Sequence, residues 1–314
     1  GLGVGGDPSK GRECHEENRE DIRKTLEGAD LVFVAAGMGG GTGTGGTPIV
    51  AEVAKEIEAL TIGVVTKPFS FEGSHRMKKA IEGIEELRGK VDTLIVIPND
   101  RLLAISDDDM TMSSAFSLAD NVLRQGVQSI AELILVPGEI NLDFADVRAI
   151  MKNAGPAWMA IGTGSGPNRA IMAAEEATNS PLLEVDIDGA KGVLFNVAGG
   201  ADLTLEEVHR ASEVISKRVH PDANIIFGTS SNSDLEEEVK VTVIATGFHD
   251  AAESAAKDLA LEQAAIDDPS IMTIPPFLRH HPAARRRFRN GGMFKEGALE
   301  MIGEGKDEVF AADD

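Results

Sequence analysis

The stretch "AAGMGGGTGTGGTP" (residues 35–48) lies between a short apolar run, "LVFVA" (31–35), and an amphipathic segment, "IVAEVAKEIEAL" (49–60). The apolar run predicts a buried strand, and the segment after the glycines predicts a helix. Glycines in such number remove side chains and allow positive φ, so that successive N–H groups can converge on one point. A ring of N–H groups at the N-terminus of a helix suits an anion, and we expect a phosphate group there.

The same alternation of strand and helix continues along the chain. Apolar runs at 61–66 and 93–98 predict two more strands, and the segment 74–88 between them predicts a helix. Continuous apolar strands separated by helices are typical of a parallel sheet that is covered on both faces.

A long helix is predicted for residues 113–135, with Ser113 or Ser114 as its N-cap. Its apolar residues recur at steps of three and four without an intervening proline. A second mixed α/β unit follows, with strands expected at 157–163, 192–199, 224–230 and 239–246 and helices at 168–179 and 204–219. The fold class predicted from these patterns is α/β, with two domains and a tail.

Composition narrows the classes of function. A formal charge of −22 over 314 residues argues against general binding to nucleic acid or to anionic membranes, which are polyanions. Cys14 is the single cysteine, so an intrachain disulfide is excluded and a reducing compartment fits best. No apolar run reaches the roughly 20 residues of a membrane span, and we expect a cytoplasmic protein.

The glycine motif "GGGTGTG" (39–45) is neither the Rossmann G-x-G-x-x-G nor the P-loop, because no Lys and Ser/Thr pair follows it. By glycine count alone it could be a plain tight turn. Between a strand and a helix, however, it resembles the signature of the tubulin-like GTPases. Together with "VVTKPFSFEG" (64–73), it makes the chain resemble the FtsZ family of bacterial cell-division GTPases, from residue 1 to about 247 and again at "IPPFLR" (274–279).

The resemblance implies a tubulin-like GTPase domain with a Rossmann-like parallel sheet, a long central helix, a second mixed α/β domain and a flexible tail. The expected segments are the GTP-binding domain (1–112), the central helix (113–136), the catalytic loop and polymerisation domain (137–248), a linker (249–270), and a partner-binding peptide with a disordered tail (271–314). "GLGVGGDP" (1–8) matches the loop that senses the γ-phosphate. The family's earlier glycine loop and first strands are expected upstream of it, so we interpret the sequence as a fragment that is incomplete at its N-terminus.

The resemblance also carries over the contacts to GTP or GDP, residue by residue. Backbone N–H groups and threonine hydroxyls of the phosphate loop would hold the β- and γ-phosphates: Gly40, Gly41, Thr42, Gly43, Thr44 and Gly45. Thr66 and Pro68 match the next strand-end loop, and Asn99 matches a contact to base or ribose.

Two further pairs of residues match nucleotide contacts. Glu72 and Arg76 match a pair that contacts ribose and phosphate, although without the family they are more simply an exposed i, i+4 salt bridge. Phe116 would stack on guanine, and Asp120 would accept from its N1 and N2 hydrogens. Four residues apart on a helix, these two face the same side; without the family, Phe116 would be core and Asp120 surface.

The motif "NLDFAD" (141–146) resembles the family's catalytic loop through Asn141, Asp143 and Asp146. The simpler interpretation is an Asx-turn and an N-cap for the helix "VRAIMKN" (147–153). A helix of about twenty residues separates this loop from Phe116 by roughly 30 Å. We therefore expect subunits to stack head to tail, so that Asp143 and Asp146 orient the water that attacks the next subunit's GTP, with Mg²⁺ on its phosphates.

The tail contains an apolar island, "IPPFLRHH" (274–281), in a polar segment. It resembles the family's docking peptide for membrane tethers and other division proteins at the septum, and its expected anchors are Ile274, Pro275, Phe277, Leu278 and Arg279. The run "RRRFR" (285–289) is either a site for acidic lipid or a solvated charge run.

Other motifs predict no site. "GTGSG" (162–166) is expected to be a loop, "DIDG" (186–189) lacks the remaining ligands of a calcium loop, and His280 with His281 does not suggest a zinc site, so no metal-ligating residue is predicted. Two other functions remain as alternatives: a non-hydrolysing paralogue that acts in assembly or regulation, and a Rossmann dehydrogenase, which the missing G-x-G-x-x-G disfavours.

Overall fold

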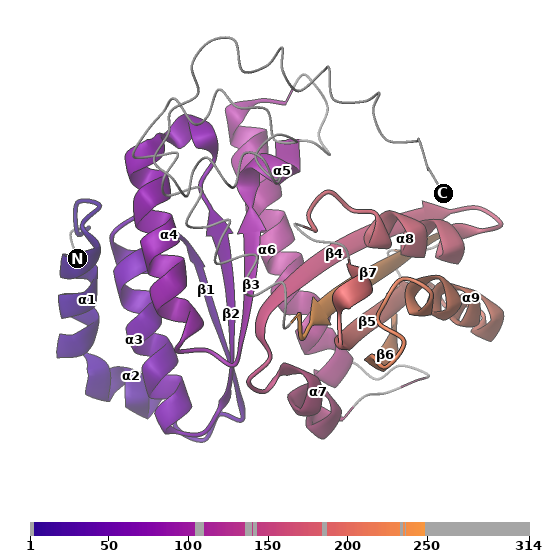
Figure 1. The fold of residues 1–314 in the computed structure, drawn as a ribbon, viewed down its shortest axis with the longest axis horizontal. Coiled ribbons are helices and arrows are strands. Elements are labelled where there is room, and N and C mark those ends of the chain that lie inside the picture. The colour runs from indigo at the N-terminus through magenta and orange to yellow at the C-terminus, as the bar shows by residue number, and fades with distance from the viewer. Residues whose placement is uncertain are drawn as a thin grey trace, which may run out of the picture. The chain divides into compact units, whose positions relative to one another are not determined.

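The computed structural model describes residues 3–103, 110–135, 140, 143–183, 187–232, 235 and 237–248 (Figure 1). All of them lie in the first of the two units into which the chain divides, Gly1–Ala260. Asn141, the linker 249–270, and the peptide and tail 271–314 lie outside the described residues.

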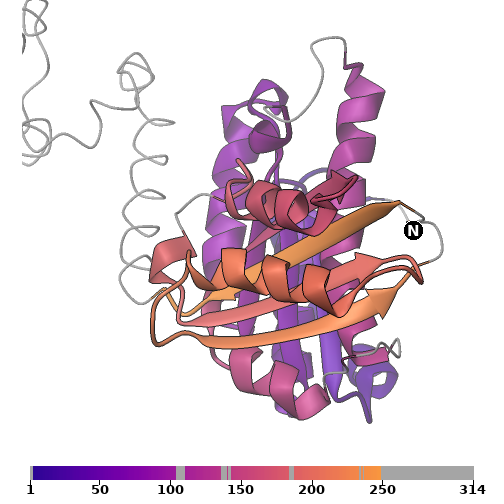
Figure 2. The same cartoon turned by 90° about the vertical axis from the view of Figure 1, so that its right-hand side faces the viewer.

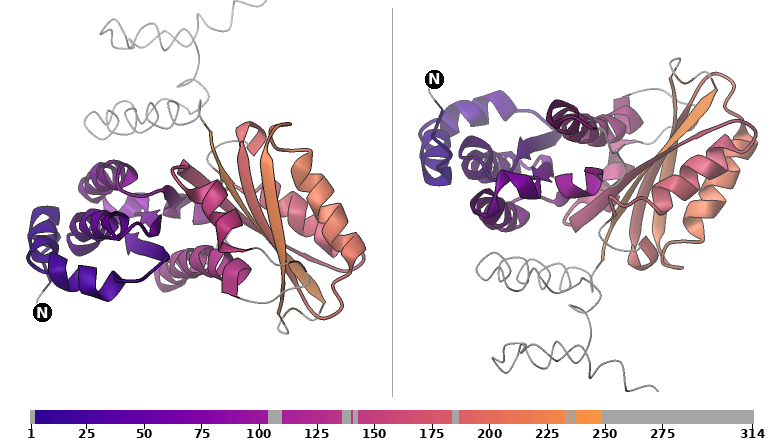
Figure 3. Two further views of the ribbon diagram at one scale, coloured as in Figure 1. Left: turned by 90° about the horizontal axis from the view of Figure 1, so that it is seen from below. Right: turned by 90° about the horizontal axis from the view of Figure 1, so that it is seen from above.

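Three parallel strands form the first part of the sheet. They are β1 (Leu31–Gly37), β2 (Leu60–Lys67) and β3 (Thr93–Pro98), paired in the order β1-β2-β3. Strands β2 and β3 are buried on both faces, as their apolar runs predicted, whereas in β1 only Val32 and Val34 are buried and Ala35 is exposed. Figure 3 shows helices on both sides of these strands.

The two faces are covered by different helices. Val65 packs with α3 (Thr42–Glu56) and α4 (Ser74–Arg88) in one core cluster. Ile62 and Val64 pack on the other side, with α5 (Asn99–Leu103), the long helix α6 (Met112–Leu135) and α7 (Phe144–Met151). The predicted helices at 74–88 and 113–135 are thus confirmed.

The remaining strands run parallel to some of their neighbours and antiparallel to others. They are β4 (Gly155–Ser165), β5 (Gly192–Gly199), β6 (Asn224–Ser231) and β7 (Glu238–Thr246). The described sheet has seven strands in the order β1-β2-β3-β4-β7-β5-β6. The start of β4 pairs with β3, and the rest of β4 pairs with β7, so one strand joins the two parts.

Helices α8 (Arg169–Thr178) and α9 (Leu205–Ser216) cover one face of this second part (Figure 2). Short 3₁₀ turns complete the described elements: η1 (Ser70–Glu72) and η2 (Ile187–Gly189). The predicted α/β fold, with its parallel sheet, long helix and second mixed domain, is confirmed. Among the described residues, no helix combines the length and the apolar character that a membrane span requires.

The structure corrects the loop predicted at 162–166, because β4 continues to Ser165. A Cβ at Gly162 would lie 2.1 Å from the carbonyl oxygen of Ala173, and one at Gly164 would lie 2.0 Å from that of Arg169. These glycines let the backbone of α8 lie directly on the strand.

Helix α3 begins at Thr42, seven residues before the predicted start at Ile49. The threonines and glycines of the motif therefore form the first turns of the helix, and only Gly39 between Gly37 and Gly46 has a positive φ, of 95°. The freedom to adopt positive φ that the glycines offer is therefore used at Gly39 alone within this stretch. The sequence patterns also did not predict α1 (Pro8–Glu17) and α2 (Arg19–Leu26).

Candidate functional site

The carboxyl ends of the three parallel strands lie side by side. Gly37 pairs with Thr66 across β1 and β2, and Lys67 pairs with Pro98 across β2 and β3. The segments that follow these ends carry most of the predicted nucleotide contacts. In open parallel sheets, ligands bind at this edge of the strands.

The glycine segment folds back on the helix that it precedes. The N–H of Met38 donates to the carbonyl of Thr66 at 3.0 Å, and the N–H of Gly39 donates to the Thr44 hydroxyl at 2.9 Å. Thr44 is buried, whereas Thr42 is exposed. Since the first N–H groups of an α-helix have no partner within the helix, the start of α3 offers donors to an anion.

A second glycine-rich loop, residues 3–7, lies against the first. Asp7 caps α1 by accepting from the N–H of Ser9 at 3.0 Å. A Cβ at Gly41 would lie 2.3 Å from Cγ2 of Val4 and 2.8 Å from the nitrogen of Asp7. Lys79 of α4 holds this loop through a 2.6 Å hydrogen bond to the carbonyl of Gly6.

Helices α1 and α3 run in the same direction. Gly41 lies beside Asp7, Gly45 beside Pro8, and Gly46 beside the ring of His15. Both helix N-termini therefore face the same end of the strands, and each brings the positive end of its dipole to that place. The predicted phosphate loop and the predicted γ-phosphate loop are adjacent in space.

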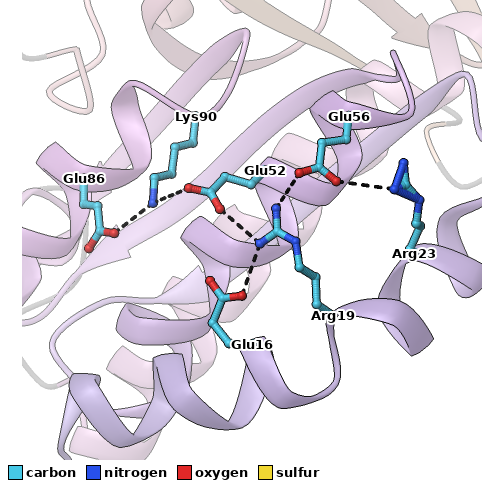
Figure 4. Close-up of polar contacts among 7 residues, drawn as sticks. All are labelled: Glu16, Arg19, Arg23, Glu52, Glu56, Glu86 and Lys90. Atoms are coloured by element: carbon cyan, nitrogen blue, oxygen red, sulfur yellow. Dashed lines mark hydrogen bonds and ion pairs between the residues drawn. The ribbon is translucent and has the colours of Figure 1, made fainter.

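A charged network fixes α1 and α2 on α3 and α4 (Figure 4). Arg19 donates to Glu52 at 3.2 Å and to Glu56 at 2.5 Å, and Lys90 lies 2.8 Å from Glu52 and 2.9 Å from Glu86. The hydrogen bond from Lys90 lowers the pKa of Glu52, with a smaller contribution from Arg19. Ion pairs, more than apolar packing, therefore hold much of α1 and α2 against α3 and α4.

Phe116, on the first turns of α6, lies in an aromatic cluster with Phe69 and Phe71. Its ring is edge-on to that of Phe69, with centroids 5.5 Å apart, and edge-on to that of Phe71 at 6.2 Å. Phe69 is fully buried, but Phe116 is 39% exposed and Phe71 is 52% exposed. Phe116 is thus not the core residue of the simpler interpretation, and its ring is accessible for stacking.

Asp120 lies one turn further along α6 and is exposed. Phe69 and Phe71 were not predicted as part of the site. The signal was present in "KPFSFEG" (67–73), where two phenylalanines directly follow a strand and a proline.

Glu72 and Arg76 form the salt bridge of the simpler interpretation, with Nε of Arg76 3.2 Å from Oε2 of Glu72. The two side chains differ in exposure, at 9% for Glu72 and 52% for Arg76. The other oxygen of Glu72 accepts from the N–H of Phe69 at 2.8 Å, so this carboxylate also fixes the turn that carries the phenylalanines. Arg76 packs against Gly39, where a Cβ would lie 2.6 Å from its carbonyl oxygen.

Asn99 follows β3 and is 5% exposed. Its Oδ1 has no hydrogen-bond partner within the described part of the chain. A buried acceptor without a partner is costly unless a ligand or water satisfies it, so Asn99 is suited to a bound molecule at this edge. Thr66 and Pro68, the other predicted contacts here, are both buried.

Asp143 and Asp146 form a capping box at the start of α7. Oδ1 of Asp143 accepts from the N–H of Asp146 at 2.9 Å, and Oδ2 of Asp146 accepts from the N–H of Asp143 at 3.4 Å. Both residues are exposed. The N-cap of the simpler interpretation is therefore present, and each carboxylate keeps one oxygen outside the box.

Helix α7 lies at the opposite end of the parallel strands from the glycine segment. Its last residue, Met151, accepts at its carbonyl from the hydroxyl of Thr93, the first residue of β3. Figure 1 shows α7 and α5 at opposite ends of the strands. The structure thus brings the predicted nucleotide contacts together and leaves Asp143 and Asp146 far from them. The described residues contain no group of three or more His, Cys, Asp or Glu side chains that could hold a metal ion.

Comparison with known proteins gives matches over most of the chain. Residues 1–107 match the model of the Tubulin/FtsZ family, GTPase domain, and residues 155–249 match that of the FtsZ family, C-terminal domain. A solved structure, an empty dimer of FtsZ from M. jannaschii, is 48% identical, with a TM-score of 0.77. The match covers 80% of this chain and 73% of that one.

Two CetZ proteins from Haloferax volcanii share the fold at lower identity. GDP-bound CetZ1 is 22% identical, with a TM-score of 0.69, and the match covers 85% of this chain and 80% of that one. CetZ2, solved as a GTPγS-bound protofilament, is 20% identical, with a TM-score of 0.68 and coverage of 85% and 81%. On the strength of its FtsZ matches, the chain belongs to the tubulin/FtsZ family of GTPases.

Proposed function

We propose that this chain binds GTP at the carboxyl edge of β1 to β3 and hydrolyses it only when subunits stack head to tail into a filament. The observation that carries the proposal is the separation between the glycine segment with Phe116 and the carboxylates of α7. At 1.5 Å per residue, the 24 residues of α6 span about 36 Å. A subunit therefore needs a neighbour to bring Asp143 and Asp146 to its nucleotide.

The nucleotide half of the site would hold GTP by its phosphates and its base. The N–H groups at the start of α3, together with Thr42 and Thr44, would bind the phosphates. Arg76 would add charge beside Gly39, and Asn99 would pair its free oxygen with the ribose or base. Phe116 would stack on guanine while Asp120 accepts from its N–H groups, which gives preference for guanine over adenine.

The catalytic half would act on the neighbour's nucleotide. The free oxygens of Asp143 and Asp146 would accept from the attacking water and orient it toward the γ-phosphate, with Asn141 as a third polar group. Mg²⁺ would offset the charge of the phosphates. Mg²⁺ usually keeps several waters and binds substrate phosphates with few protein ligands.

Head-to-tail contact is heterologous, and such a contact gives a filament when its rotation does not close a ring. Two matched structures support assembly by their own descriptions, since one is an FtsZ dimer and another is a protofilament. We propose that these filaments form the cytokinetic ring in the cytoplasm at the division septum. The peptide 274–279 would dock membrane tethers and other division proteins through Ile274, Phe277 and Leu278.

Mixing two inactive variants tests the shared site. Asp143→Ala leaves the nucleotide half intact, and Phe116→Ala combined with Asp120→Ala leaves the catalytic half intact. Each should hydrolyse GTP at least about 100-fold more slowly than wild type. An equimolar mixture should recover up to about a quarter of wild-type turnover, because a quarter of its interfaces combine two intact halves.

Asp143→Ala should bind GTP as wild type does, and Asp222→Ala, which changes an exposed aspartate outside α7, should retain turnover. Failure of the mixture to recover, or equal loss of binding and turnover in Asp143→Ala, would contradict the shared site. Light scattering that rises with GTP while no phosphate is released would favour a non-hydrolysing assembly protein instead.

A further inference from the structure

Ile140, which immediately precedes the catalytic motif, is tied to a single residue of the sheet. Its N–H donates to the hydroxyl of Thr229 at 3.1 Å, and its carbonyl accepts from the N–H of Thr229 at 3.1 Å. Thr229 is 8% exposed. Both backbone polar groups of Ile140 therefore depend on one buried threonine.

The location of Thr229 explains this pairing. It lies on β6, at the edge of the described sheet, where it pairs with Val197 of β5 on its other side. A strand at an edge leaves alternate N–H groups without a strand partner. Ile140 uses one of these groups, and its side chain packs against the core cluster of the second part of the sheet.

Ile140 is close in sequence to the predicted catalytic residues. Asn141 is adjacent to Ile140, and Asp143 follows three residues after it, which is at most about 10 Å of chain. At the other end of α7, the Thr93 hydroxyl holds the carbonyl of Met151. Asp143 and α7 thus lie in the sequence between Ile140, which is tied to β6, and Met151, which is tied to β3, and Ile140 is the nearer of the two to Asp143 along the chain.

We propose that Thr229 is a positioning residue for the catalytic loop, and this inference rests on the proposed function. Its hydroxyl fixes Ile140, and thereby helps to set where Asp143, three residues later, meets the nucleotide of the neighbouring subunit. Thr229 itself does not touch the substrate. A threonine suits the position because a β-branched residue fits a strand and the hydroxyl supplies the acceptor for the Ile140 N–H.

The test compares Thr229→Val with Thr229→Ser in the full chain. Valine keeps the shape of the side chain but removes the acceptor, whereas serine keeps the acceptor. Thr178→Val is the matched control, because Thr178 is also buried and its hydroxyl donates to the carbonyl of Ala174 within α8, away from the loop. All three variants should keep the wild-type far-UV circular dichroism spectrum.

The first measurement is amide hydrogen exchange of the peptide 140–146. We expect the Ile140 amide to exchange at least about 10-fold faster in Thr229→Val and at nearly the wild-type rate in the other two variants. This measurement requires neither GTP nor assembly. Unchanged exchange in Thr229→Val would overturn the proposal on its own.

The second measurement is GTP turnover, alone and in mixtures. Thr229→Val should lose about 10-fold or more in turnover at unchanged GTP affinity. Mixing it with the Phe116→Ala, Asp120→Ala chain should raise turnover to about a quarter of the wild-type value, whereas mixing it with Asp143→Ala should not raise it, because both partners then lack a working loop. A general loss of stability would not give that pattern.

The two proposals fail in different ways. If the wild-type chain hydrolyses no GTP at any concentration, the proposed function fails, and with it the catalytic role of Thr229, even where exchange shows that Thr229 holds Ile140. If the wild type is active and Thr229→Val loosens Ile140 but keeps full turnover, the positioning role alone is overturned.

Discussion

Gly40 and Gly45 belong to the same glycine-rich stretch, yet their surroundings differ. A Cβ at Gly45 would lie 2.0 Å from the carbonyl oxygen of Pro8 and 2.8 Å from the nitrogen of Arg12, whereas a Cβ at Gly40 would meet no atom within 4 Å. Neither residue has a positive φ. At Gly45 it is thus close approach of two helices, and not backbone freedom, that requires glycine.

Gly45→Ala and Gly40→Ala should therefore affect stability differently. Helix propensity alone predicts that alanine at Gly45 stabilises α3 by about 1 kcal/mol. The clash with backbone atoms of α1 should outweigh this gain, and we expect a net loss of about 1–3 kcal/mol in the free energy of unfolding, measured by urea denaturation. Gly40→Ala should change it by less than about 0.5 kcal/mol. Equal effects at both sites would show that α1 does not pack on α3 as described.

The roles of some single residues could be predicted from the sequence, and those of others could not. The anion-binding potential of the glycine stretch follows from its place between strand and helix, and the structure puts its helix N-terminus where that reasoning requires. The close approach at Gly45 could not be predicted, because it depends on α1, which the apolar patterns did not reveal. Asp7 as N-cap and Pro8 at the first helical position were the signals for that helix.

Among the elements, those with apolar faces were predicted closely and those held by charge were not. The strands β1 to β3 are continuous apolar runs, and α6 has a clear helical period. Within α1 and α2 the only buried residue is Gly11. Besides the close approach of α1 to α3 and the packing of Leu26, they are attached by ion pairs such as Arg19 with Glu52 and Glu56, which leave no periodic apolar signal in the sequence (Figure 4).

The contact between α8 and α9 should make stability depend on pH. Arg169 is 7% exposed and donates from Nε to Glu207 at 2.7 Å, and this hydrogen bond lowers the pKa of Glu207 to about 2. A depressed carboxylate pKa stabilises the fold fully above its unfolded value, near 4.3, and the contribution is lost as pH falls toward 2. Stability should therefore decline between about pH 5 and pH 2.

Glu207→Gln isolates this effect. We expect it to cost about 1–3 kcal/mol at pH 7, because buried Arg169 then keeps only one of its two partner charges, Asp202 at 2.7 Å, and much less at pH 2.5. Glu206→Gln is the control, since that carboxylate is exposed and pairs with Arg210 one turn along α9. Urea denaturation at both pH values measures the difference. A Glu207→Gln cost that is the same at pH 7 and pH 2.5 would contradict the role of the ion pair.

For the whole molecule, the sequence patterns could not predict that the strands form one continuous sheet. Two sets of strands on either side of a long helix suggest two separate domains, but β4 pairs with β3 through Gly155–Ala157 and with β7 along the rest of its length. Strand pairing between distant segments is a tertiary property that local periodicity does not encode. The separation of the two predicted half-sites, by contrast, follows from the length of one helix and was available from sequence.

A site divided between subunits predicts how turnover depends on protein concentration. In the proposed mechanism, a subunit that is alone has a nucleotide without catalytic carboxylates, so GTP hydrolysis per subunit should be near zero at low concentration and rise to a plateau as neighbours associate. Turnover and GTP-dependent light scattering should rise over the same concentration range, and GDP should support less scattering.

Asp143→Ala should scatter as wild type does while releasing phosphate at least about 100-fold more slowly, since it keeps the stacking surfaces but loses a carboxylate needed for hydrolysis. Turnover per subunit that stays constant on dilution, through the range in which scattering disappears, would place a complete active site in one subunit and rule out the head-to-tail mechanism.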